Sequence, residues 1–109
     1  METEELIPID VLQEKVIKAL KSCYDPEIPV DIWELGLIYE LKFDKERNLT
    51  IKMTLTSPGC PVAGSLPGEV ENTVRRVEGL KSVGVELVWS PPWEKDMMSE
   101  VAKLELGFL

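Results

Sequence analysis

The sequence predicts a two-layer α+β fold, with helices packed on one face of a small sheet. Two stretches place apolar residues at helical spacing, and three others alternate apolar with polar residues as half-buried strands do. Their order is helix, β-hairpin, helix, strand, followed by a short helix. Residues 1–109 are about the size of one domain and contain no linker or repeat, so we expect a single domain.

The first helix is predicted to begin at Asp10, which is placed to cap it, with Gln13 three residues later to complete a capping box. One apolar stripe runs along this helix and ends at Cys23. Cys23 is therefore interpreted as a buried core residue rather than a ligand. The stripe consists of Leu12, Val16, Ala19, Leu20 and Cys23.

The loop that follows, DPEIPVDIWELG at residues 25–36, is acidic and contains two prolines. Carboxylates in a loop are usually only solvated, which is one interpretation of this segment. The other rests on Pro26 and Pro29, because a merely solvated loop has no need of residues that restrict the backbone. The carboxylates are those of Asp25, Glu27, Asp31 and Glu34.

A β-hairpin is predicted next, with strands at residues 37–43 and 49–56 joined by a polar turn at residues 44–47. In the first strand, Tyr39, Leu41 and Phe43 are expected on one face. In the second strand, the three threonines and a lysine point away from the core. The residues that point toward the core are Leu49, Ile51, Met53 and Leu55.

Helical spacing resumes after the segment TSPGCP, at Val62, and continues to Val77, with Gly79 as a C-terminal stop. Pro67 interrupts this pattern because it has no amide hydrogen to donate. We therefore expect either a kink at Pro67 or a short first turn followed by a restarted helix.

A third strand is predicted at residues 82–89, with Trp89 on its core face, and Ser99 is expected to cap the terminal helix. The helical stripes and strand faces together predict one hydrophobic core. Its members are Leu12, Val16, Leu20, Leu41, Ile51, Met53, Leu55, Val74, Val85 and Leu87.

Composition and charge exclude several classes of function. The chain carries 20 acidic and 12 basic residues, and its net charge of −8 repels nucleic acid and anionic membranes. The absence of histidine rules out the catalytic and metal sites that depend on this residue. No apolar run approaches the roughly 20 residues of a membrane span. The acidic start METEELIPID does not resemble a secretion signal, so we expect a cytoplasmic protein.

Cys60 is the residue most indicative of function. It lies between a predicted strand and a predicted helix, where Gly59 permits a tight turn and Pro61 suits the first helical position. The helix N-terminus stabilises a thiolate there by roughly 0.3–1 kcal/mol, and by up to about 2 kcal/mol in favourable geometry. The alternative is that Cys60 only fills space at the start of the helix.

Trp93 is a second candidate for a functional role. It follows two prolines and lies outside the alternation of the third strand. We expect it at or near the surface, beside the helix start at Cys60, where it lines a pocket or contacts a partner.

Three segments, DPEIPVDIWELGLIYEL, TLTSPGCP and VELVWSPPWEKDMMSE, resemble in their order and spacing the metal–sulfur cluster biosynthesis proteins. This family includes SufT-like and PaaD-like proteins and the eukaryotic cytosolic iron–sulfur targeting factors. The resemblance implies a fold akin to the NifU C-terminal domain and a role in assembling or delivering iron–sulfur clusters. It also implies that Cys60 is the key residue and that Asp25 and Glu27 belong to the acidic signature.

The resemblance defines a candidate site. Cys60, Asp25 and Glu27 are expected to hold iron or a labile iron–sulfur cluster. Many family members carry asparagine where this chain has Asp31, and an aliphatic residue at position 23, which agrees with a core role for Cys23. The surrounding pocket or partner surface is expected to include Glu34, Thr56, Ser57 and Trp93.

Three functions remain open. The first is a non-catalytic factor that binds iron or a labile cluster, the second a metal-free adaptor for apoproteins, and the third an enzyme with Cys60 as nucleophile. A carboxylate about 6 Å from Cys60 opposes its thiolate by roughly 3 kcal/mol at an effective dielectric of about 20. This exceeds the benefit from the helix and disfavours an enzyme, whereas a bound cation reverses the balance.

A single cysteine predicts a weak and transient metal site, because iron–sulfur clusters normally require several thiolates. The missing ligands then come from a small thiol, a carboxylate, a second subunit or a client protein. Expected partners are apoprotein clients and other iron–sulfur assembly proteins. The sequence leaves open the client, the cluster type and whether the chain forms a homodimer.

Overall fold

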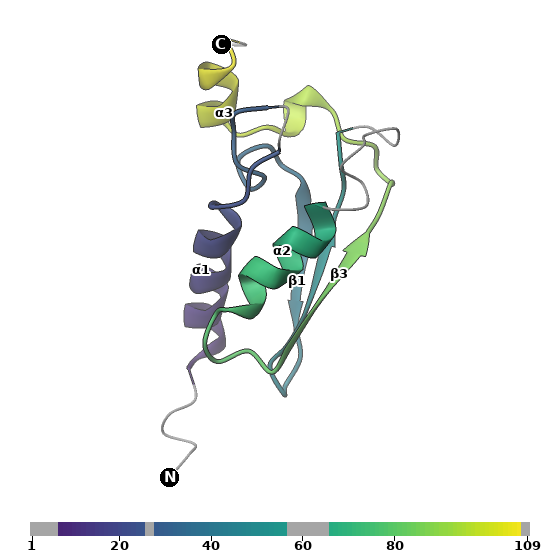
Figure 1. The fold of residues 1–109 in the computed structure, drawn as a ribbon. Helices are drawn as coiled ribbons and strands as arrows, with labels where there is room; N and C mark the ends of the chain where they lie inside the picture. The colour runs from purple at the N-terminus through teal and green to yellow at the C-terminus, as the bar shows by residue number, and fades with distance from the viewer. Residues whose placement is uncertain (1–6, 26–27, 57–65, 108–109) are drawn as a thin grey trace.

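A computed structural model describes residues 7–25, 28–56 and 66–107 of the chain. Helices and strands follow in the predicted order, which confirms the α+β fold (Figure 1). The elements are α1 (Ile9–Leu20), β1 (Ile38–Phe43), β2 (Asn48–Met53), α2 (Leu66–Arg75), β3 (Ser82–Leu87), the 3-10 turn η3 (Lys95–Met97) and α3 (Glu100–Glu105).

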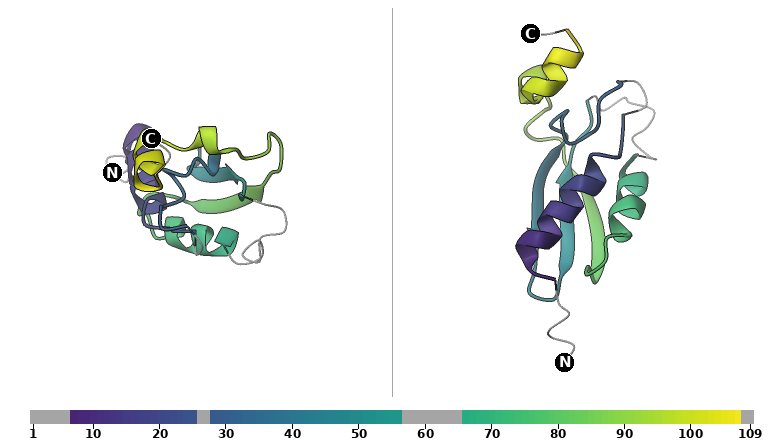
Figure 2. Two further views of the ribbon diagram at one scale, coloured as in Figure 1. Left: turned by 90° about the horizontal axis from the view of Figure 1, so that it is seen from above. Right: turned by 90° about the vertical axis from the view of Figure 1, so that its left-hand side faces the viewer.

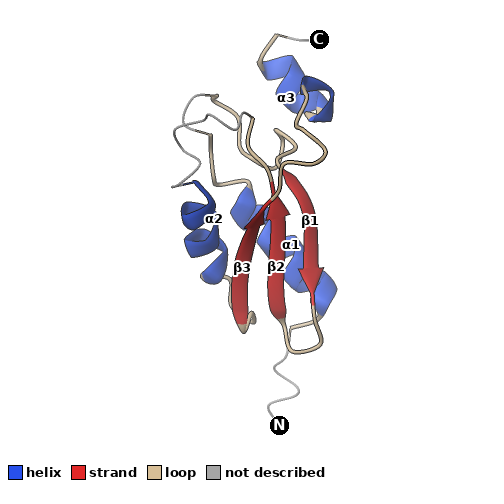
Figure 3. Ribbon diagram, turned by 90° about the vertical axis from the view of Figure 1, so that its right-hand side faces the viewer, coloured by secondary structure: helices blue, strands red, loops and turns tan. Residues whose placement is uncertain are grey.

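The three strands form one sheet in the order β1-β2-β3. β1 and β2 pair antiparallel, as expected of a hairpin, whereas β3 runs parallel to β2 after the crossover through α2. Both long helices lie on the same face of this sheet, and no helix of the described residues covers the opposite face (Figures 2 and 3). The arrangement is the predicted two-layer fold.

The predicted core is confirmed. Seven of its ten members are at most 2% exposed, and Leu41, Val85 and Leu87 are partly buried against them. The sequence analysis missed the contribution of the loop before β1, whose apolar residues turn inward between its acidic ones. The loop's buried apolar residues are Val30, Ile32, Leu35 and Leu37.

The hairpin turn is confirmed, and Asp44 explains why it forms. One carboxylate oxygen of Asp44 accepts hydrogen bonds from the backbone amides of Glu46 and Asn48, at 2.8 and 2.9 Å. Arg47 adopts a positive φ of 68°, which closes the turn. The Asn48 side chain in turn accepts a bond from the Ser82 hydroxyl at 2.6 Å, so the turn also fixes the start of β3.

The predicted cap of the first helix is wrong. α1 begins at Ile9 after Pro8, and no side chain caps it. Asp10 lies inside the first turn, where its carboxylate accepts a bond from the adjacent amide of Val11. Proline fixes φ at a value compatible with a helix, which favours a start before Asp10. The predicted cap of the last helix is confirmed, since the Ser99 hydroxyl accepts a bond from the Ala102 amide at 3.1 Å.

The predicted face of Tyr39 is also wrong, because β1 contains a β-bulge. Its register with β2 shifts between Ile38 and Glu40, so Ile38 stands opposite Met53 in the position that simple alternation gives to Tyr39. Leu41 and Phe43 pair with the core residues of β2 as predicted.

Two predictions that extended strands beyond their ends are wrong as well. β3 ends at Leu87, and Trp89 is 41% exposed rather than packed in the core. β2 ends at Met53, and Thr54 is fully buried instead of facing solvent. The alternation of residue types continues past the point where strand pairing stops, so sequence alone placed both ends too late.

The described part of α2 carries the predicted stripe, with Leu66, Val70 and Val74 buried. Pro67 lies in the first described turn, and the helix ends at Arg75, before Gly79. The prediction that the helical pattern starts at Val62 falls outside the described residues.

Candidate functional site

Two of the three motif segments meet at one end of the molecule. α1 and β2 end there, β1 and α2 begin there, and the segment after β3 crosses over them (Figure 1). The indole nitrogen of Trp93 donates a hydrogen bond to the carbonyl oxygen of Leu35 at 2.7 Å. The backbone amide of Ser99 donates to the carbonyl oxygen of Glu34 at 2.8 Å. The acidic loop and the C-terminal motif are therefore joined by hydrogen bonds to two backbone carbonyls of the loop.

Gly36 permits this close approach. It has a positive φ of 79°, and a Cβ added to it would overlap the carbonyl group of Met97 in η3. A side chain at position 36 is thus opposed both by the backbone conformation and by the neighbouring segment. The glycine of the DIWELG sequence therefore allows the C-terminal segment to pack closely against this loop.

The acidic loop owes its shape to Asp31. One oxygen of its carboxylate accepts hydrogen bonds from the amides of Trp33 and Glu34, both at 3.0 Å. The Ile32 amide also donates to the carbonyl oxygen of Cys23 at 2.9 Å, which ties the loop to the end of α1. Asp31 therefore acts as the cap of a tight turn, a role that asparagine can also fill.

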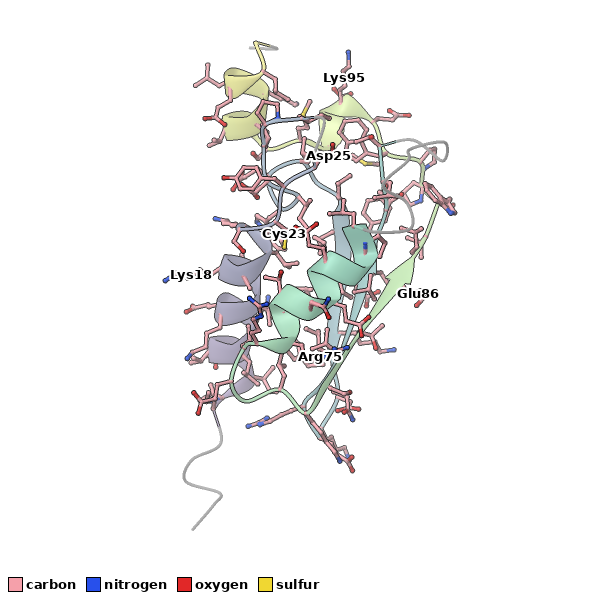
Figure 4. The ribbon with its side chains drawn as sticks, in the orientation of Figure 1. Lys18, Cys23, Asp25, Arg75, Glu86 and Lys95 are labelled. Carbon is pink, nitrogen blue, oxygen red and sulfur yellow. The ribbon has the colours of Figure 1, made fainter. Side chains whose placement is uncertain are left out.

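Asp25 and Glu34 point into different environments. Asp25 is 3% exposed, contrary to the interpretation that the loop carboxylates are only solvated, and lies at the motif-bearing end (Figure 4). Glu34 forms an ion pair with Lys21 at 3.5 Å, and its side chain is 20% exposed. Glu34 is therefore part of a surface ion pair, whereas Asp25 is a buried acidic residue at the same end. Glu27 lies outside the described residues.

Cys23 lies between α1 and α2 and is 2% exposed, which confirms the core interpretation (Figure 4). Burial raises the pKa of its thiol, the hydrogen bond from Thr73 lowers it, and the charge of Glu69 raises it further. The net upward shift keeps the thiol protonated and unreactive at neutral pH.

The two tryptophans of the WSPPW sequence lie in different environments, and only the prediction for Trp89 is wrong. Trp93 is partly buried against the core and held by its bond to Leu35, whereas Trp89 is the exposed one. Both lie in the segment that follows β3, but only Trp93 has a defined polar partner among the described residues. β3 already ends at Leu87, and the sequence signal against a strand that reaches Trp89 is the pair of prolines in SPP directly after it.

The start of β1 is attached to the same segment. Tyr39 donates through its hydroxyl to the carbonyl oxygen of Pro91 at 2.7 Å. Burial raises the pKa of Tyr39, while the hydrogen bond with Thr54 lowers it. The Thr54 amide donates to the carbonyl oxygen of Leu37 at 2.8 Å. The bulge and the buried threonine therefore fix the end of β2 relative to the C-terminal motif.

Thr56, which follows this attachment, is partly buried. The predicted residues Ser57 and Cys60 lie outside the described part of the chain. Leu66, the first described residue of α2, lies at the same end as the end of β2 (Figure 3).

Among residues 7–25, 28–56 and 66–107, no group of three or more cysteine or carboxylate side chains could hold a metal ion. A metal at this end of the molecule would need ligands from the rest of the chain or from another molecule. Over the same residues, no helix is long and apolar enough to cross a membrane.

Comparison with known proteins agrees with this architecture. Residues 13–87 match the model of a family described as iron–sulfur cluster assembly protein. A Porphyromonas gingivalis protein named Fe-S protein maturation auxiliary factor is 46% identical over 97 residues, covering 89% of this chain and 92% of the other. The Staphylococcus aureus Fe-S protein maturation auxiliary factor SufT is 45% identical over 83 residues, covering 76% and 94% respectively.

A crystal structure of a domain of unknown function from Bacillus anthracis has the same fold. Its TM-score is 0.84 at 39% sequence identity, over 92% of this chain and 95% of that one. The fold, the matched residues and the relatives agree, and the chain belongs to the iron–sulfur cluster assembly protein family.

Proposed function

We propose that this chain is a non-catalytic accessory factor of iron–sulfur cluster assembly, which receives iron or a labile cluster through Cys60 and passes it to apoproteins. The observation that carries the proposal is the position of Asp25. This carboxylate is 3% exposed at the end of the molecule where β2 ends and α2 begins, and these elements flank the segment that contains Cys60.

Electrostatics supports a cation at this end. A carboxylate beside a thiolate raises the free energy of the doubly charged pair, by roughly 3 kcal/mol at about 6 Å with an effective dielectric of about 20. A metal ion removes this penalty because it attracts both groups. Asp25 and Glu27 would therefore favour a metal-bound Cys60 over a free, nucleophilic Cys60 thiolate.

An incomplete set of ligands supports transfer rather than storage. The chain has two cysteines, and Cys23 is buried as a protonated thiol, so one chain would contribute a single thiolate, that of Cys60. A site based on one cysteine would share its cargo with ligands of another molecule, which would lower the barrier to release. The relatives from Porphyromonas gingivalis and Staphylococcus aureus are named auxiliary factors, which agrees with a role that is not enzymatic.

A metal-free adaptor is the second candidate, and the exposed side chain of Trp89 is the observation that favours it. Tryptophan in a protein interface commonly contributes much of the binding energy. An adaptor would bind apoproteins through this end without holding metal itself.

Anaerobic reconstitution with ferrous iron and sulfide tests the main proposal. Wild type should retain iron after desalting and transfer it to an apo-ferredoxin, whereas Cys60→Ser should remain folded and lose both properties. Cys23→Ala is the matched cysteine control and should retain them, at a modest cost in stability. Asp25→Asn with Glu27→Gln should weaken iron retention, and Asp10→Asn with Glu78→Gln should not.

The outcomes separate the candidates. Equal iron retention by wild type and Cys60→Ser would contradict the proposed site. If neither protein binds iron, yet Trp89→Ala abolishes binding to an apoprotein client, the adaptor is the better account.

A further inference from the structure

The outer edge of β1 offers hydrogen-bonding groups that no described residue pairs with. β1 pairs only with β2, through its other edge. The Asp44 amide donates toward β2, to the carbonyl oxygen of Asn48 at 3.1 Å. Since successive backbone groups alternate in direction, the amides and carbonyls of Leu41 and Phe43 point outward. The edge therefore carries a template for another strand.

Opposite charges stand on either side of Leu41. Glu40 and Lys42 are both exposed on the uncovered face of the sheet. Glu40 lies 3.6 Å from Lys52 of β2, whereas Lys42 forms no ion pair with any described residue. An additional strand along this edge would bring its own side chains beside these two charges.

We propose that β1 pairs antiparallel with β1 of a second copy, around a two-fold axis at Leu41, to form a continuous six-stranded sheet. In this register Leu41 stands opposite Leu41 of the second copy. Glu40 then faces Lys42 of the second copy, and Lys42 faces its Glu40, so the interface contains two cross-strand ion pairs. The sequence of the edge is thus complementary to itself.

The surroundings of the edge favour a second copy over other occupants. A shallow hollow of about 160 Å³ lies beside it, lined in part by Gln13 of α1, Trp33 and the partly buried Leu41. Charged residues and bulges on edge strands normally discourage pairing with foreign strands. Here the bulge before Glu40 restricts regular pairing to a short stretch of β1. The two charges favour a partner strand that places a basic residue opposite Glu40 and an acidic residue opposite Lys42.

The other free edge lacks this property. Along β3, Glu86 is the single charged residue, so two copies of β3 paired antiparallel would gain no ion pair. The edge of β1 is therefore the self-complementary one. The proposed pairing does not depend on metal binding, because the two-fold axis directs the motif-bearing ends of the two copies away from each other.

Charge variants test the proposal by sedimentation velocity of the full chain over a range of concentrations. Wild type should show a concentration-dependent dimer. Lys42→Glu and Glu40→Lys each place like charges opposite each other twice, and each should raise the dimer dissociation constant about tenfold or more. Lys45→Glu makes the same charge change in the hairpin turn and should leave the constant unchanged.

Mixing the two variants is the decisive experiment. In an equimolar mixture of Lys42→Glu and Glu40→Lys, each position 40 faces an opposite charge at position 42 of the other chain. The mixture should therefore dimerise at concentrations at which neither variant alone forms a dimer, and circular dichroism should show both variants folded. Amide exchange offers a second measurement on wild type, where Leu41 and Phe43 should become protected as concentration rises.

A wild type that stays monomeric at millimolar concentration, with Leu41 and Phe43 amides exchanging at the same rate throughout, would overturn the proposal. A dimer that persists unchanged in both charge variants would also overturn it, and would place the interface elsewhere. Protection of these amides only on addition of an extended peptide would assign the edge to another protein.

Discussion

At one end of the sheet, β1 and β2 are joined by four residues, whereas long segments of chain gather at the other end. The short turn is fixed by local hydrogen bonds to Asp44, and the Asn48 side chain links it to Ser82 at the start of the neighbouring β3. The opposite end relies on contacts between residues more than 50 positions apart, such as Trp93 with Leu35. It also buries the carboxylate of Asp25 and exposes Trp89.

The difference indicates that residues at the hairpin-turn end stabilise the fold, whereas some residues at the motif-bearing end are candidates for function. Every polar group named at the turn end has a structural purpose that explains it. At the motif-bearing end, by contrast, a carboxylate is buried and a tryptophan is exposed, and such features are typical of binding sites.

Gly36→Ala should have the largest effect on stability, because the added methyl group prevents the C-terminal segment from packing against residue 36. The positive φ and the overlap with the Met97 carbonyl together should lower the free energy of unfolding by about 3 kcal/mol. Urea denaturation measures this loss. Gly84→Ala, in the open face of β3 with no atom near the added methyl, is the matched control and should change stability by less than about 1 kcal/mol. Equal effects of the two substitutions would show that Gly36 is not a docking position.

The two tryptophans of the same motif should respond differently to phenylalanine. Trp93→Phe removes the bond to the Leu35 carbonyl and should cost about 1–2 kcal/mol. Trp89→Phe should stay within about 0.5 kcal/mol, as surface substitutions usually do. Thermal and urea unfolding of both variants provide the comparison. A larger loss for Trp89→Phe would reverse the assignment of structural and exposed roles.

Asp44→Asn should produce the smallest effect, visible as a change in pH dependence. Hydrogen bonds with Asn48 hold the pKa of Asp44 below its ordinary value of 3.8. The charged form therefore adds stability above pH 3.8, and this stability is lost as the pH falls through the depressed pKa. The difference in unfolding free energy between wild type and Asp44→Asn should shrink on acidification. A difference that is constant with pH would mean that the charge of Asp44 contributes nothing.

The sequence predicted the periodic parts of this fold well. The stripe of α1 and the alternation of β2 each report on a single buried face, so their residues were placed correctly. The bulge at Tyr39 could not be predicted in this way, because alternation does not show which residue is extra. The exposure of Trp89 was missed for a related reason, since strand pairing ends before the residue pattern does.

The site was predicted only in outline. The three motifs correctly indicated the family, and two of them meet in space. The burial of Asp25 and the surface ion pair of Glu34 depend on contacts with distant segments, which spacing along the chain does not reveal. Likewise, the acidic character of residues 25–36 concealed that the same loop supplies Val30, Ile32 and Leu35 to the core.

The parallel pairing of β2 with β3 has a consequence for the order of folding. The hairpin of β1 and β2 needs only its short turn, whereas β3 cannot join until the crossover through α2 has closed. Contacts between residues distant in sequence form slowly, because the chain loses conformational entropy before these contacts stabilise it. The hairpin should therefore form early and serve as the surface on which α2 and β3 assemble. The motif-bearing end of the molecule should then be organised last. Destabilising substitutions there, such as Gly36→Ala, should mainly accelerate unfolding and leave the refolding rate almost unchanged.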